Sequence, residues 1–96
     1  MATFAVTHKH KAETCPAGNA QMAPMLLKHL SKPNASASGV AIRSEIVLDG
    51  KHTLLLVVDA KDQGTVQKFM TPFAQMGSVD VEPASPCESV VARGKC

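Results

Sequence analysis

The segment from Val40 to Asp59 reads VAIRSEIVLDGKHTLLLVVD, and it decides the fold. Its first half, Val40–Leu48, alternates apolar and polar side chains, which is typical of a strand with one exposed face. Asp49-Gly50 follows and favours a two-residue hairpin turn in which both residues adopt positive φ. The second half, His52–Asp59, is apolar on both faces, so we expect a central strand that is covered on both sides.

The rest of the chain supplies the partners of this hairpin. Apolar side chains recur at every second position in the strands and at helical spacing between them. In the first hairpin strand this alternation places four apolar residues on one face: Val40, Ile42, Ile46 and Leu48. In chain order the expected elements are a strand at 3–10, a loop at 11–21, a helix at 22–30, a loop at 33–39, the hairpin, a helix at 63–76, a strand at 78–82 and a final strand at 87–93.

The helix expected at residues 63–76 carries the clearest boundary signals. Asp62 precedes it as an N-cap, and Gly77 follows where a left-handed residue would end it. Pro72 lies inside the helical pattern, and a proline there removes a backbone donor. We therefore expect a kink or a separate last turn at Pro72.

The element order predicts an α+β fold with ferredoxin-like β-α-β-β-α-β topology and an extra C-terminal strand. Helices cover one face of such a sheet. Because strand 52–59 is apolar on both faces, the other face needs cover, and the simplest cover is a second copy stacked about 10 Å away. We expect a single domain over residues 1–96 that forms a homodimer, a dimeric α+β barrel.

Composition excludes several classes of function. The chain of 96 residues is 45% hydrophobic and 19% charged, as in a single globular domain. A net charge of +2, dispersed basic residues, three Phe and neither Trp nor Tyr argue against nucleic acid as a partner. The longest aliphatic run, residues 54–58, is too short for a membrane span. No signal-peptide pattern and an odd count of three Cys favour a cytoplasmic protein with reduced thiols.

Three potential metal ligands lie close together near the N-terminus, namely His8, His10 and Cys15. On an extended strand His8 and His10 point to the same face, with Cα atoms roughly 6.6 Å apart. Cys15 lies in the following loop and can fold back toward them. Two imidazoles and a thiolate suit Zn, Cu or Ni, and Glu13 or Cys87 could supply a fourth ligand.

The position of this group follows from how the strands are paired. We expect the C-terminal ends of strands 3–10 and 52–59 to lie together, which would place His8 and His10 near Val58 and Asp59. His52 would then be a solvated turn residue at the opposite end.

Other readings of the same residues stay open. Cys15 could form a redox pair with Cys87 if their Cα atoms lie within about 7 Å of each other. The Cys15-Pro16 dipeptide resembles haem-regulatory motifs, but the scarcity of aromatic residues makes haem unlikely. We expect His29 to be a satisfied residue at the edge of the core and Cys96 to have no role.

The element order, the length and the doubly apolar strand resemble the dimeric α+β-barrel superfamily with ferredoxin-like topology, over about residues 3–93. Within it, Phe4–His10, the Cys15-Pro16 loop and Pro83–Glu88 are similar to small bacterial proteins of unassigned function. The superfamily includes monooxygenases, isomerases, haem-binding and haem-degrading enzymes, and ligand-binding modules. The resemblance implies a pocket beside the sheet and carries no catalytic signature.

Three functions follow as hypotheses. The leading one is a homodimer that binds a transition metal or small ligand through His8, His10 and Cys15. The second is a small pocket enzyme, an isomerase or monooxygenase, with His8 as general base. The third is a non-catalytic dimeric module without a site.

Overall fold

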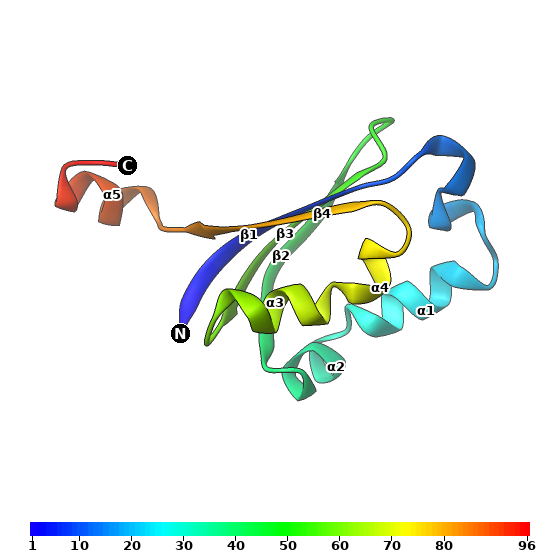
Figure 1. Cartoon of the computed structure of the whole chain (residues 1–96), viewed down its shortest axis with the longest axis horizontal. Coiled ribbons are helices and arrows are strands. Elements are labelled where there is room, and N and C mark those ends of the chain that lie inside the picture. The colour runs from blue at the N-terminus through cyan, green and yellow to red at the C-terminus, as the bar shows by residue number, and fades with distance from the viewer.

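Four strands form one antiparallel sheet in the computed structural model, which describes residues 1–96. They are β1 (Ala2–Lys9), β2 (Val40–Leu48), β3 (Thr53–Ala60) and β4 (Ser78–Ala84). The strand order is β2-β3-β1-β4, so β1 and β3 lie in the middle of the sheet (Figure 1). This order is compatible with the ferredoxin-like topology expected from the sequence, and the α+β class is confirmed.

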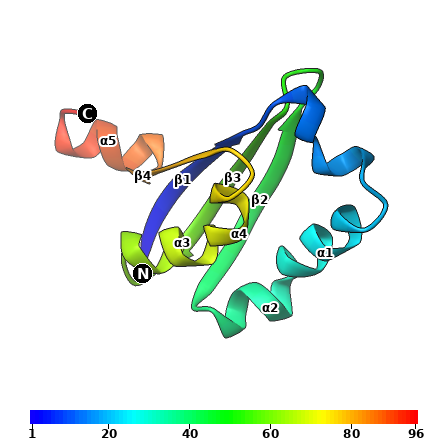
Figure 2. The ribbon, with the colours of Figure 1, turned by 45° about the vertical axis from the view of Figure 1, so that its right-hand side comes forward.

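Helices α1 to α4 lie on one side of the sheet, and α5 projects from its end (Figures 1 and 2). None of the helices has the length and apolar character that crossing a bilayer requires. The helical elements are two short 3₁₀ turns, η1 (Ala12–Thr14) and η2 (Pro16–Gly18), and the helices α1 (Met22–His29), α2 (Lys32–Ala37), α3 (Gln63–Phe69), α4 (Thr71–Ala74) and α5 (Cys87–Arg93).

The boundary signals around residues 63–76 act largely as expected. The Asp62 carboxylate accepts a hydrogen bond from the Thr65 backbone N–H at 2.8 Å and caps α3. The helix breaks at Met70, and Pro72 lies in the first turn of α4, where its missing N–H costs no hydrogen bond.

Gly77 is needed for a different reason than the one expected. It is not among the glycines with positive φ, so it does not end the helix in the left-handed conformation. A Cβ at this position would overlap the backbone carbonyl of Lys9. The glycine therefore allows the start of β4 to approach the end of β1.

Two segments adopt a different structure from the one expected. Residues 33–39, expected to be a loop, mostly belong to α2, because Pro33 fits its first turn and Ala35 is fully buried. The expected last strand at residues 87–93 is the helix α5. By Ala84, which pairs with Thr3 near the start of β1, no strand is left to pair with, so the following residues satisfy their backbone groups locally.

The hairpin loop has four residues rather than the expected two, since Leu48 pairs with Thr53. Asp49 does not have positive φ; the residues that do are Gly50 at 71° and His52 at 48°. A non-glycine residue is uncommon in this region of backbone space. The end of this loop is therefore held in a conformation that local propensity does not favour.

The core lies between the sheet and α1 to α4. A β-bulge at Arg43 shifts the register of β2, so that Ile46 pairs with Leu55 and does not share the core face of Val40 and Ile42 as expected. Ile46 and Val57 are 56% and 39% exposed on the side without helices, so within one chain β3 is covered on one face only. The buried core residues are Phe4, Val6, Ala35, Val40, Leu56, Val58, Ala60, Val66, Phe69, Met70, Phe73 and Val81.

Candidate metal centre

The pairing of β1 with β3 decides which side chains meet. The two strands are antiparallel, with His8 opposite Leu54, so the expected position near Val58 and Asp59 is wrong. Two positions further along the chain, the His10 backbone N–H donates to the His52 carbonyl at 3.2 Å. The end of β1 therefore meets the start of β3, and His52 lies beside His10 instead of at the opposite end of the sheet.

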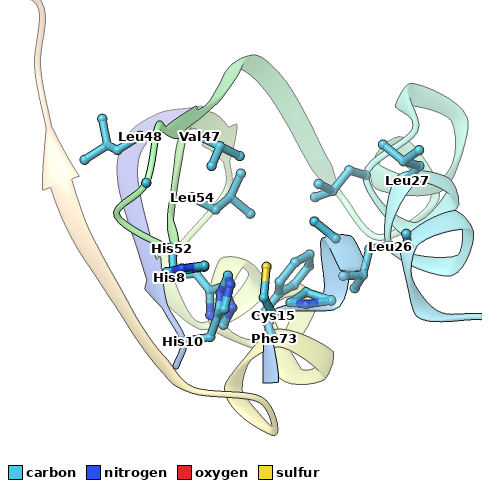
Figure 3. A pocket seen from close by; sticks show the side chains of 15 residues that line it. His8, His10, Cys15, Leu26, Leu27, Val47, Leu48, His52, Leu54 and Phe73 are labelled. Atoms are coloured by element: carbon cyan, nitrogen blue, oxygen red, sulfur yellow. The ribbon is translucent and has the colours of Figure 1, made fainter. Parts of the chain in front are cut away.

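His10, Cys15 and His52 form a group whose ligating atoms all lie within 4.8 Å of one another. The two imidazole centroids are 5.3 Å apart with their planes at 69°. Figure 3 shows both rings and the Cys15 sulfur bordering the same pocket. Two of the three ligands expected from the sequence are thus brought together, and this group could hold a metal ion.

Each member of the group is held by local structure. Cys15 lies between η1 and η2, its N–H donates to the Ala12 carbonyl at 3.3 Å, and its own carbonyl accepts from the Gly18 N–H at 3.3 Å. His52 lies beside His10 and Cys15 with its backbone in the left-handed conformation. This conformation costs a residue other than glycine about 1–2 kcal/mol. Such strain persists only where the surrounding structure enforces it, and it is found preferentially at functional sites.

His8, the remaining ligand expected from the sequence, lies outside this group but next to it. Its ring centroid is 5.3 Å from that of His10 and 5.2 Å from that of Phe73. The side chain is only 1% exposed. Its Nδ1 lies 3.0 Å from the Ser78 carbonyl oxygen, which can only accept, so Nδ1 is the atom that carries the proton.

His8 on β1 and His10 just after it favour their neutral forms. Burial lowers the pKa of His8, the hydrogen bond to Ser78 opposes this shift in part, and the charge of His10 lowers it further. The pKa of His10 is also lowered, first by burial and then by the charge of His52. Neutral imidazole is the form that ligates metals.

Three buried nitrogens have no hydrogen-bond partner: both ring nitrogens of His10, which belongs to the group, and Nε2 of the adjacent His8. A buried polar atom without a partner costs about 1–3 kcal/mol. In a chain of this size such atoms call for an explanation, and an ion or ligand at this position would supply one.

A cavity of about 360 Å³ adjoins the group. His8, His10, Cys15 and His52 border it. Its other walls are mainly apolar and come from α1, the β2–β3 hairpin and α4 (Figure 3). The apolar side chains that define these walls are Leu26, Leu27, Leu30, Val47, Leu54 and Phe73.

The remaining candidates lie elsewhere. Nε2 of His29 lies 2.7 Å from the Phe69 carbonyl and its ring stacks on Phe69 at 4.4 Å, so the expected core-edge role is confirmed. All three cysteines are free thiols. Cys87 is exposed on α5, at the other end of the molecule from Cys15 (Figure 1), so within one chain it is neither a redox partner nor a fourth ligand. Glu13 is exposed and is not part of the group.

His52 is a potential ligand that was not expected from the sequence, although a signal was present. In a split βαβ sheet the two central strands are antiparallel, so the end of β1 must meet the start of β3. A histidine immediately before β3 is therefore placed beside a histidine immediately after β1.

A family model described as a domain of unknown function, DUF3303, matches residues 3–95. The chain belongs to this family. The match agrees with the expected resemblance to proteins of unassigned function, whereas membership of the wider barrel superfamily stays a prediction. No curated protein and no solved structure matches significantly. The function of this DUF3303 chain therefore has to be argued from its site.

Proposed function

We propose that this protein binds a first-row transition metal ion, Zn²⁺, Cu or Ni, through His10, Cys15 and His52. The observation that supports this most is that three ligating atoms from separate segments lie within 4.8 Å of one another. Two imidazoles and a thiolate suit these ions, whereas Mg²⁺ and Ca²⁺ prefer oxygen ligands. Three protein ligands leave one coordination position for water or a small molecule, as in catalytic zinc sites.

The environment of the group fits an ion. Both ring nitrogens of His10 are buried without partners, so a metal bond would satisfy one of them at no cost in lost hydrogen bonds. Burial already disfavours protonation of this ring, and less proton competition means tighter metal binding near neutral pH. Cys15 must stay reduced, which places the proposed function in a reducing compartment such as the cytoplasm.

Elemental analysis of tag-free protein, reconstituted with Zn²⁺ and desalted, tests the proposal. We expect stoichiometric zinc in the wild type and in Cys87→Ser, and far less than one zinc per chain in Cys15→Ser and His52→Ala. His8→Gln keeps a donor for the Ser78 carbonyl and should retain the metal; if it loses the metal, His8 belongs to the ligand set as the sequence suggested. Near-zero zinc in all proteins would overturn the proposal and leave a module without a site.

A second candidate is a pocket enzyme in which His8 acts as the general base. The hydrogen bond from Nδ1 to Ser78 fixes the tautomer, so Nε2 is the basic atom, and it has no partner in the protein. A base oriented in this way suits proton abstraction from a substrate in the adjoining cavity. Long-range ¹H–¹⁵N NMR spectra test the orientation: protonated Nδ1 is expected at neutral pH, and protonated Nε2 would exclude this role.

We also propose that the protein is a homodimer in which the open faces of two sheets pack together. Ile46, Leu55 and Val57 form an apolar strip on this face, and no helix of the same chain covers it. Stacking two such faces about 10 Å apart would bury the strip. Light scattering should give a dimer mass for the wild type and a monomer mass for Val57→Asp; a monomeric wild type would contradict the proposal.

A further inference from the structure

The cavity beside the metal group has two unlike parts. Its inner end carries the histidines and Cys15, whereas its walls are apolar and contain no Asp, Glu, Lys or Arg. At about 360 Å³ it lies at the lower end of the range of small-molecule sites. We propose that it binds a small hydrophobic acid, a carboxylate on an apolar chain, whose head group occupies the open coordination position of the metal. This inference rests on the proposed metal site.

The net charge of the metal centre favours an anionic head group on the ligand. A divalent ion, one thiolate and two neutral imidazoles carry a net charge of +1. No acidic residue lines the cavity to balance this charge. A charge left unpaired in an apolar site is costly, and a monoanionic donor makes the whole centre neutral. Carboxylate oxygen is a normal zinc ligand, so a carboxylate can supply both the donor atom and the charge.

The apolar walls of the cavity favour an apolar chain on the ligand. Leu27 on α1 and Val47 on β2 both line the cavity but remain 70% and 61% exposed. Figure 3 shows them on the two sides of the pocket, with Leu26 and Leu54 deeper inside. Exposed apolar side chains that form a contiguous patch are typical of ligand-binding grooves and other interaction sites. An apolar tail placed between them would remove both walls from water.

The size of the effect follows from the area that a tail buries. Each buried methylene contributes about 0.8 kcal/mol, which corresponds to roughly fourfold in affinity. Straight-chain acids should therefore bind progressively more tightly from acetate to hexanoate, until the chain outgrows the cavity. A polar acid of the same length should not show this trend, because the walls offer its tail no hydrogen bonds.

Visible spectroscopy of the Co²⁺-loaded, full-length protein tests the inference, with acetate, butyrate and hexanoate as probes and hexanol as the uncharged control. We expect each acid to change the cobalt absorption bands, affinity to rise about fourfold per methylene, and hexanol to bind at least tenfold more weakly than hexanoate. Leu27→Ser should weaken hexanoate severalfold and leave acetate unchanged. Met25→Ser is the matched control, because Met25 lies on the same helix at 69% exposure and does not line the cavity.

Failure of the inference is distinguishable from failure of the metal site. If Co²⁺ binds but the acids do not change its absorption bands, the proposed ligand class is wrong and the metal site stands. The same holds if the affinity for the acids does not depend on their chain length. If Co²⁺ does not bind, the proposed function itself fails. Hexanoate binding that is equally tight with and without metal would overturn the claim that the metal holds the carboxylate.

Discussion

The space between the sheet and the helices has two halves of different character. One half is filled: Val58, Val66 and Met70 are fully buried there, and Phe69 packs beside them. The other half holds the cavity, the unpartnered nitrogens of His8 and His10, and the left-handed His52. Each of those features costs stability. We therefore infer that the filled half stabilises the fold and that the hollow half is available to bind a ligand.

The largest effect is expected in the filled half. Phe69→Ala should lower the free energy of unfolding by about 3–5 kcal/mol, because it removes a large buried ring and leaves a cavity. Leu27→Ala in the hollow half should change it by no more than about 0.5 kcal/mol, because this side chain is mostly exposed. Urea unfolding of both variants measures the contrast, and equal losses would abolish the distinction between the halves.

Gly77→Ala should affect both halves at once. The new methyl group would collide with the Lys9 carbonyl and displace the end of β1, on which His10 depends. We expect a loss of about 1–3 kcal/mol in stability and of about 10–100-fold in zinc affinity. Chemical denaturation and a competition titration measure the two losses. Gly18→Ala is the control, because a Cβ there meets nothing within 4 Å; a similar loss in that variant would argue against the close-approach explanation.

At His52 the choice of replacement should matter for stability but not for metal binding. His52→Gly relieves the left-handed strain, so the metal-free variant should be more stable than His52→Ala by about 1 kcal/mol. Neither variant should hold zinc as the wild type does. Thermal unfolding of the metal-free proteins checks the order, and an Ala variant at least as stable as the Gly variant would show that position 52 is not strained.

The smallest effect is the response of the metal-free protein to acid. An unfolded histidine titrates near pH 6.5, whereas burial lowers the pKa of His8 and His10 in the folded state. The unfolded chain therefore binds more protons just below pH 6.5, and stability should fall as the pH is lowered through this window. Urea midpoints at several pH values should show a shallower decline for His8→Gln, and an unchanged slope would mean that His8 does not contribute.

Much of the fold could be predicted from residues 40–59, because alternation and a Gly-containing turn are local signals. The α5 helix could not, because whether residues 87–93 pair as a strand depends on where β1 begins, which is a tertiary fact. The same holds for the register of β2, which the bulge at Arg43 shifts by one residue.

Two of the three members of the candidate site could be predicted from the sequence. His10 and Cys15 are close in sequence and could be grouped from spacing alone. His52 is 42 positions beyond His10, and it joins the group only through the antiparallel pairing of β1 and β3 and a positive φ, which is uncommon for any residue other than glycine. Sequence patterns do not reveal such a conformation, since only a few per cent of non-glycine residues adopt positive φ.

The most direct test of the central claim is X-ray absorption at the zinc edge of the reconstituted protein. We expect zinc to be surrounded by one sulfur at about 2.3 Å and two imidazole nitrogens at about 2.0–2.1 Å, and the sulfur contribution should vanish in Cys15→Ser. A shell of nitrogen and oxygen alone in the wild type would contradict the assignment of His10, Cys15 and His52 as the metal centre.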